Sequence, residues 1–144
     1  MAGKRKATAL PEAVSKLKSG TRIEGDLDLS RTSVVTLPKK FQVRGSLNLS
    51  GTAITRLPKD LQIGGNLDLS DSDIKRLPDN LHVPGDLIMI GTRIKQLPKG
   101  LHVRGNLDLR ASTILALSKG LRVDGNLDLS GTMIKQIPDR IRVA

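Results

Sequence analysis

Apolar and polar positions alternate along the chain in a block that recurs every 20 residues. From residue 25 onward the sequence divides without a gap into six 20-residue copies, each of which begins with glycine. A fixed period of this size is typical of a solenoid, in which each repeat forms one coil and buries its apolar side chains against its neighbours. The repeats therefore predict a single elongated domain over residues 25–144.

Within a repeat, the apolar spacing predicts a strand followed by an irregular return limb. Apolar residues or glycine occupy every second position over residues 61–69, as in a strand that points alternate side chains inward. After Leu69 the spacing widens to Ile74 and Leu77, which suits a turn and a return limb. Gly65 lies on the inward phase, where the missing side chain permits a close backbone approach or a bend.

The repeat resembles a known family in the run L-x-L-x-x-(T/S)-x-I-x-x-L-P, which is similar to the leucine-rich repeat L-x-L-x-x-N-x-L-x-x-L-P. The matching runs are residues 27–38, 47–58, 67–78, 87–98, 107–118 and 127–138, the fifth ending in Ser118 where the others end in proline. The 20-residue length and the Leu-Pro pair resemble the bacterial class in the repeat domains of type III secreted effectors. This resemblance implies a right-handed stack of coils with a parallel β-sheet on one face.

Two departures from the family's pattern bear on the fold. A hydroxyl replaces the family's asparagine, and it can bond locally but less completely than an amide. These hydroxyl residues are Thr32, Thr52, Ser72, Thr92, Ser112 and Thr132. The leucine usually three residues before L-x-L is also missing, and an apolar residue one position earlier, such as Ile63 or Val83, lengthens the strand. These differences leave open a β-helix-like coil with a second strand.

The two ends of the chain differ from the repeats and from each other. Residues 1–9 predict a basic flexible tail, and residues 10–24 predict an N-terminal cap. Within this cap, residues 10–20 predict a short amphipathic helix, with proline near its start and glycine at its end. At the carboxyl end no comparable cap follows Val143, so we expect either end-to-end dimerisation through the last coil or a truncated chain.

Composition restricts the core and the cellular location. The chain has no Cys, Trp or Tyr and a single Phe, Phe41, so an aliphatic core without disulfides is predicted. Neither a secretory signal nor an apolar stretch of the roughly 18–20 residues that cross a membrane is present. We expect a cytoplasmic protein of a bacterium or of a phage-infected cell, and secretion into a host by a route without a cleaved signal stays open.

The net charge of +10 conceals two faces of opposite sign. Positions 24, 26, 28 and 30, with their equivalents 20 residues apart, face outward on the predicted strand and carry eight acids and three bases. All other positions together carry +15. The strand face is therefore predicted to be acidic and the remaining surface basic.

The basic surface gives an alternative function, the binding of nucleic acid or an anionic membrane. The residues that would carry it are Lys4, Arg5 and Lys6 at the amino end and the column Lys75, Lys95 and Lys135 on the convex side. No exposed aromatic platform for base stacking and no recognised nucleic-acid motif is apparent, so a solvated surface that keeps the protein soluble is the favoured interpretation.

Candidate chemistry is sparse. His82 and His102 occupy the same turn position in adjacent repeats, about 5 Å apart, but no third metal ligand is in register with them. Asp108 and Asp128 are also neighbours and can offer oxygen ligands to Ca²⁺, although polar outward strand residues are ordinary in repeat proteins. Without a nucleophile or a pocket, two carboxylates do not make a hydrolase. We predict no enzyme activity, catalytic residue, metal or cofactor.

The strongest departure from the repeat pattern is a pair of isoleucines in the fourth repeat. Ile88 and Ile90 replace Asp or Asn and Ser or Arg, and Asp68 and Asp108 flank them. Small apolar centres with polar rims are typical of protein interfaces. The predicted partner-binding residues are Ile88, Ile90, Asp68, Asp108, Arg110 and Asp128.

Our leading hypothesis is a non-enzymatic protein-binding module whose partner is basic and partly apolar. A bacterial effector or a phage-type inhibitor that occupies the basic groove of an enzyme would use the same face.

Overall fold

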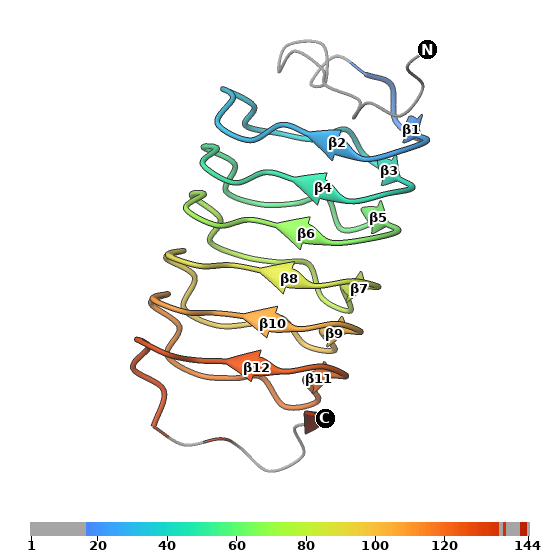
Figure 1. The fold of residues 1–144 in the computed structure, drawn as a ribbon. Coiled ribbons are helices and arrows are strands. Elements are labelled where there is room, and N and C mark those ends of the chain that lie inside the picture. The colour runs from blue at the N-terminus through green and yellow to red at the C-terminus, as the bar shows by residue number, and fades with distance from the viewer. Residues whose placement is uncertain (1–16, 136, 138–141, 144) are drawn as a thin grey trace.

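The chain folds as a parallel β-solenoid in a computed structural model that describes residues 17–135, 137 and 142–143. The coils stack along one axis, and each residue lies next to its equivalent 20 positions away (Figure 1). We number the coils from the strand that opens each of them. The first coil is residues 22–41, the second 42–61, the third 62–81, the fourth 82–101 and the fifth 102–121, and a sixth begins at residue 122.

Each coil holds two short strands rather than one long strand per repeat, and the stacking of the coils fits that of leucine-rich repeats. The second strand of each coil joins a six-stranded parallel sheet, which we call the front sheet. Its strands are β2 (Leu27–Asp28), β4 (Leu47–Asn48), β6 (Leu67–Asp68), β8 (Leu87–Ile88), β10 (Leu107–Asp108) and β12 (Leu127–Asp128). A parallel sheet on one face is therefore confirmed.

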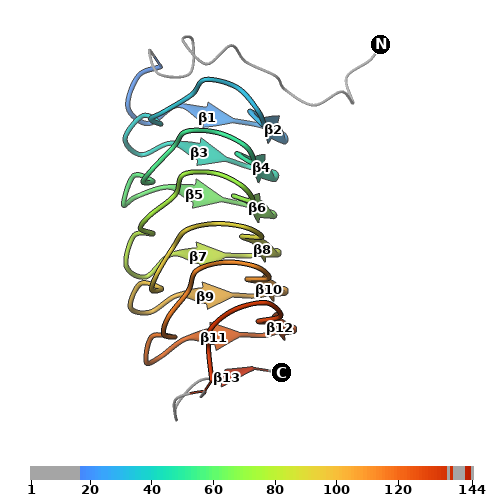
Figure 2. The same ribbon diagram turned by 90° about the vertical axis from the view of Figure 1, so that its left-hand side faces the viewer.

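The opening strands of the coils stack separately, as the side sheets (Figure 2). One side sheet contains β1 (Arg22–Ile23), β3 (Gln42–Val43) and β5 (Gln62–Ile63). The other contains β7 (His82–Val83), β9 (His102–Val103), β11 (Arg122–Val123) and β13 (Arg142–Val143).

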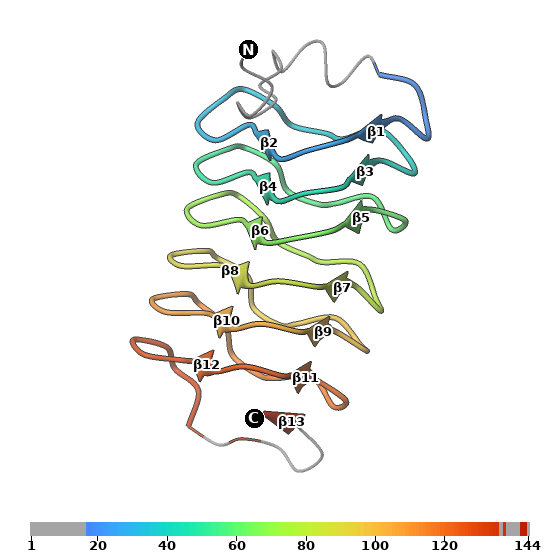
Figure 3. The ribbon, with the colours of Figure 1, turned by 45° about the vertical axis from the view of Figure 1, so that its right-hand side comes forward.

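A bend separates the side strand from the front strand in every coil, next to the repeat glycine (Figure 3). The single strand predicted over residues 61–69 is therefore wrong, although its inward and outward phases are correct. At this bend adjacent coils touch backbone to backbone. A Cβ on Gly105 would lie 2.8 Å from both the carbonyl carbon and the oxygen of Gly85, so only glycine fits there without a shift.

The core is aliphatic and runs the length of the stack. Leu67, Leu69 and Ile74 are fully buried, and Met89 takes the place of a leucine with no exposure. Phe41 is also fully buried. Burial of such a side chain contributes about 1.5–3 kcal/mol, and each coil supplies several of them. The predicted inward columns are confirmed.

Five of the six hydroxyls that replace the family's asparagine bond within their own coil, and the sixth, that of buried Ser112, has no hydrogen-bond partner among the described residues. The Thr52 hydroxyl donates to the carbonyl oxygen of Leu49 at 2.7 Å, and the same contact recurs at Thr32, Ser72, Thr92 and Thr132. This local bond is the one that the sequence predicted. It tightens the turn after the front strand but does not tie one coil to the next.

A side-chain ladder at a different position connects the coils instead. The Asn66 Oδ1 atom accepts the backbone N–H of Asp86 at 2.8 Å, and the Asp86 Oδ1 atom accepts that of Asn106 at the same distance. Equivalent bonds start from Asp26, Ser46 and Asn106. This ladder at position 26 of the repeat gives the outward polar column a structural role that the sequence did not reveal.

The predicted N-terminal helix is not supported. Residues 10–16 and the tail at 1–9 lie outside the described residues, and residues 17–20 form a bend and a turn rather than helix. Leu17 still packs, partly buried, against the core. No helix in the described part of the chain is long and apolar enough to cross a membrane.

Candidate binding surfaces

The front sheet presents the acidic surface, but its boundary differs from the prediction. Position 24 of the repeat, including Glu24 and Asp124, lies in the bend directly after the side strand and not on the front sheet. The outward positions that remain on the front sheet are 26, 28 and 30, and in the six coils they carry six acids and one base. The acidic character of this face is therefore more pronounced than the sequence indicated.

The carboxylates at position 28 also shape the backbone. The Asp128 Oδ1 atom accepts the backbone N–H of Ser130 at 3.0 Å and its hydroxyl at 2.6 Å. These two bonds, with a smaller contribution from the positive charge of Arg110, lower the pKa of Asp128. Asp28, Asn48 and Asp68 accept the same backbone N–H from the serine two residues on. One oxygen of each side chain is thus committed to the scaffold.

The isoleucine pair rearranges this pattern in the fourth coil. Ile88 offers no acceptor, and the backbone N–H of Ile90 instead donates to the Ser70 hydroxyl of the preceding coil at 3.2 Å. Both isoleucines lie on outward positions, as predicted, and both are half-buried there. Ile88 lies in register between Asp68 and Asp108, as the sequence predicted.

A shallow hollow of about 160 Å³ adjoins Ile88 on the front sheet. Its charged lining consists of Asp26, Asp28 and Asp68, and the rest is polar or aliphatic. Carboxylates on one side and an aliphatic wall on the other suit a lysine or arginine side chain, whose stem is apolar and whose head is cationic.

Asp108, Arg110 and Asp128 form a separate cluster. Arg110 Nη2 lies 2.8 Å from Asp108 Oδ2, Arg110 Nε lies 2.9 Å from Asp108 Oδ1, and a third contact of 3.7 Å reaches Asp128. The hydrogen bonds to Asp108 raise the pKa of Arg110. The guanidinium of Arg110 therefore lies between Asp108 and Asp128, the two carboxylates that the sequence suggested as Ca²⁺ ligands.

The histidines lie on the second side sheet. The ring centroids of His82 and His102 are 4.8 Å apart, and His102 Nε2 lies 3.1 Å from Asp124 Oδ2. That hydrogen bond is the main cause of the lowered pKa of Asp124. Burial lowers the pKa of His82, and the positive charges of His102 and Arg104 lower it further. Among the described residues, no group of three or more histidines and acidic residues is placed to hold a metal ion.

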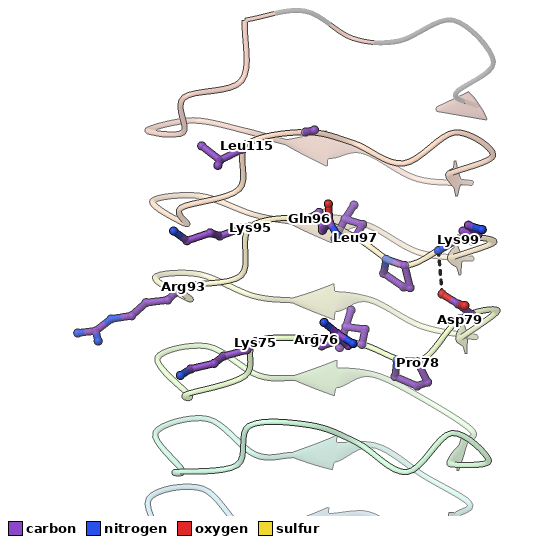
Figure 4. Close-up of a pocket in the computed structure, with 13 residues that line it drawn as sticks. Lys75, Arg76, Pro78, Asp79, Arg93, Lys95, Gln96, Leu97, Lys99 and Leu115 are labelled. Carbon is purple, nitrogen blue, oxygen red and sulfur yellow. Dashed lines mark hydrogen bonds between the residues drawn. The ribbon is translucent and has the colours of Figure 1, made fainter.

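A groove of about 1070 Å³ lies on the opposite surface, along the return limbs of the third, fourth and fifth coils (Figure 4). We call it the return-limb groove. Lys75, Arg76, Arg93, Lys95 and Lys99 line it together with a single acid, Asp79.

The sequence foresaw only part of this groove. Lys75 and Lys95 were predicted as members of a basic column, and they lie here, whereas Lys135 is exposed outside the lining. Lys4, Arg5 and Lys6 lie outside the described residues. Arg93 and Lys99 were missed, because they belong to different columns of the repeat and only the winding of the return limb brings them together.

Ion pairing distinguishes the two surfaces. Five arginines on the front face, the bends and the side strands, whose side chains the structure describes, have an acid within 4.0 Å: Arg22, Arg44, Arg104, Arg110 and Arg122. Within the described residues, none of the five cations of the return-limb groove has such a partner. Among the described residues, the positive charge of the groove is therefore not neutralised by ion pairs.

Comparison with known proteins does not assign the chain to a family. No protein-family model matches it, and a search of the curated proteins finds no match. The resemblance to bacterial leucine-rich repeats therefore stays a prediction that rests on the repeat pattern.

Proposed function

We propose that the protein is a non-enzymatic binding module whose front sheet takes a basic, partly aliphatic segment of a partner protein. The observation that carries the proposal is the juxtaposition of half-buried Ile88 with the acidic hollow lined by Asp26, Asp28 and Asp68. A row of short parallel strands presents this hollow on a regular surface, and repeat proteins commonly bind partners on such surfaces.

The chemistry of the hollow defines the partner. Its carboxylates are held in place by hydrogen bonds to the backbone, so a bound cation would cost little reorganisation of the protein. Ile88 supplies an apolar wall, which favours a lysine or arginine next to an aliphatic residue over a purely polar cation. Ile90, two residues after the end of β8, extends this apolar centre.

The test is a selection of displayed peptides against the immobilised protein, followed by affinity measurements on variants. We expect enriched peptides that combine lysine or arginine with aliphatic residues. The double variant Ile88→Asn with Ile90→Ser copies Asn48 and Ser50 of the second coil, so it restores that coil's hydrogen bonds without changing the net charge. It should weaken binding about tenfold or more, as loss of an apolar anchor does.

The control is Met133→Ser on the sixth coil, which removes an exposed apolar side chain away from the hollow and leaves the net charge unchanged. This control should bind the selected peptides as tightly as the unaltered protein. Selected peptides without basic residues, or equal affinity for the Ile88→Asn, Ile90→Ser variant, would show that the front sheet is not the binding surface proposed.

A further inference from the structure

We propose that the return-limb groove is a second binding site, which takes an extended acidic peptide segment with aliphatic side chains. This site is on a different surface from the front sheet, so it does not rest on the function proposed above. Three features of the groove define the ligand: its charge, its floor and its backbone.

The charge of the groove selects an anion. Five cations face one acid, and Asp79 is itself engaged, because its Oδ1 atom accepts the backbone N–H of Lys99 at 3.2 Å. In Figure 4, Lys75 of the third coil and Arg93 and Lys95 of the fourth project from their return limbs toward the same side of the stack. Like charges in a concave surface repel one another and raise the local positive potential, so an anionic ligand relieves this repulsion when it binds.

The floor of the groove selects a ligand with aliphatic groups. Leu77, Leu97 and Pro98 line it and are buried within the chain, and their edges form its apolar base. Leu115 lies at the rim and is 61% exposed, one of the few large apolar side chains left in solvent. A free phosphate would leave this apolar surface uncovered, whereas a peptide of acidic and aliphatic residues would cover it.

The backbone of the return limbs that line the groove favours a peptide over other polyanions. In the third and fifth coils the backbone N–H groups of Lys75 and Leu115 donate to the preceding coil, at 3.0 and 2.8 Å. The equivalent N–H of Lys95, and that of Arg93, make no such bond within the described residues. These donors lie along the groove, where an extended chain can pair with them as an added strand does at a sheet edge.

Two other anionic partners fit the groove less well. Proteins that bind single-stranded nucleic acid stack its bases on exposed aromatic side chains. Phe41 is the chain's one Phe, Trp or Tyr, and it is fully buried. A bilayer surface is broad, and the recessed Leu77 and Leu97 cannot reach it from the base of the groove. Binding of nucleic acid remains as an outcome of the experiment.

The experiment measures fluorescence anisotropy with a short labelled peptide of alternating glutamate and leucine. An alternating glutamate and serine peptide and a labelled oligouridylate serve as comparison probes. We expect the glutamate and leucine peptide to bind most tightly. Charge reversal by Lys75→Glu with Lys95→Glu should weaken it about tenfold or more, since both cations face the ligand. Leu115→Ser should lower the affinity for the leucine-containing peptide and leave the affinity for the serine-containing peptide unchanged.

Matched controls keep the result specific. Lys18→Glu with Lys39→Glu changes the net charge by the same amount on the exposed surface of the first turn and first coil, and should alter affinity by about twofold at most. Ile88→Asn with Ile90→Ser should leave this affinity unchanged, because the two sites are separate.

Three outcomes would overturn the proposal. One is the absence of binding by the glutamate and leucine peptide at low salt. Another is an equal loss of affinity in the Lys18, Lys39 and the Lys75, Lys95 variants, which would indicate attraction by net charge alone. The third is oligouridylate binding of equal strength that the Lys75, Lys95 variant abolishes, which would make the groove a general polyanion site.

Discussion

The front sheet and the side sheets are built from the same repeat, yet one is continuous and the other is divided. The front sheet pairs through all six strands, whereas the side strands β5 and β7 are not joined. The cause is Pro84. Its equivalents Arg44, Gly64, Arg104 and Asp124 donate their backbone N–H to the preceding coil at 2.8–2.9 Å, and proline has no N–H to donate.

The return limbs show the same interruption at the same level. Parallel bridges join Arg56 to Arg76 and Gln96 to Ala116, but in the part of the chain that the structure describes no bridge joins position 76 to position 96, nor position 36 to position 56. Between the third and fourth coils, the stack is thus held by the front sheet, the core and the corners. The front sheet thus stays paired through its six strands, whereas the other two sides lack backbone pairing between the third and fourth coils, where the return-limb groove lies.

The largest effect is expected at the corner that joins the front and side sheets. A valine at Gly105 would place its Cβ 2.8 Å from the Gly85 backbone, and backbone atoms cannot move aside as a flexible side chain can. We expect Gly105→Val to lower the free energy of unfolding by about 3 kcal/mol in urea denaturation.

Gly25 is the matched control, because it opens the first repeat and a Cβ there meets nothing within 4 Å. Gly25→Val should cost about 0.5 kcal/mol or less. Equal losses at the two glycines would show that the close approach of coils is not what requires glycine.

A proline at a new position should divide the side sheet a second time. Arg104 donates its backbone N–H to Val83 at 2.9 Å, so Arg104→Pro removes the bond that joins β7 and β9 there. We expect a loss of about 2 kcal/mol in the free energy of unfolding. The reciprocal change, Pro84→Arg, gives the fourth coil the residue of the second and fifth coils and should add about 0.5–1 kcal/mol.

Hydrogen exchange provides the second measurement for this pair. Pro84→Arg should slow exchange of the backbone amides in the side strand β7 and leave those of the front strand β8 unchanged. Slower exchange in both strands would mean that the two sheets do not respond separately. No change in stability in either variant would show that the missing N–H is not the cause of the division.

The sequence revealed the inward positions but not how the outward ones are used. Leu67, Leu69 and Ile74 were predictable because burial imposes a period that is visible in the apolar residues. The bend at Gly65 was not distinguished from a straight strand, since a change of direction leaves the alternation of inward and outward residues intact. The ladder was missed because Asn66 and Asp86 look like solvated residues until the neighbouring coil places a backbone N–H within reach.

The candidate sites show the same limit. Ile88 was recognised because the other repeats have Asp or Asn at its position, and such a departure is visible when the repeats are aligned. Its partial burial and the bond from Ile90 to Ser70 depend on the stacking of two coils. Arg93 and Lys99 could have been found only by winding the return limb in three dimensions, because neither belongs to the column of Lys75 and Lys95.

A smaller effect is expected where the side-chain ladder of the front sheet joins the third coil to the fourth. Asn66→Ala leaves the backbone N–H of Asp86 without its acceptor and should cost about 1 kcal/mol in urea denaturation. Asn126→Ala is the control, since its side chain bonds no further coil within the described residues, and it should cost about 0.5 kcal/mol or less. A loss as small at Asn66 as at Asn126 would show that the ladder adds nothing to the stability of the front sheet.

The smallest effect is a pH dependence of the stability, which arises from the histidine pair on the side sheet. The front sheet has no equivalent pair among its described residues. The pKa of His82 is lowered in the folded protein, by burial first and then by His102 and Arg104. The unfolded chain therefore binds a proton more readily, so stability is retained above the ordinary histidine pKa and falls as the pH drops through it toward the folded value. His82→Gln, which copies Gln62 of the third coil, removes this proton and should flatten the decline between about pH 8 and pH 5. Thermal denaturation across that range measures the difference between the two proteins, and an identical slope in both would mean that His82 titrates alike in the folded and unfolded chain.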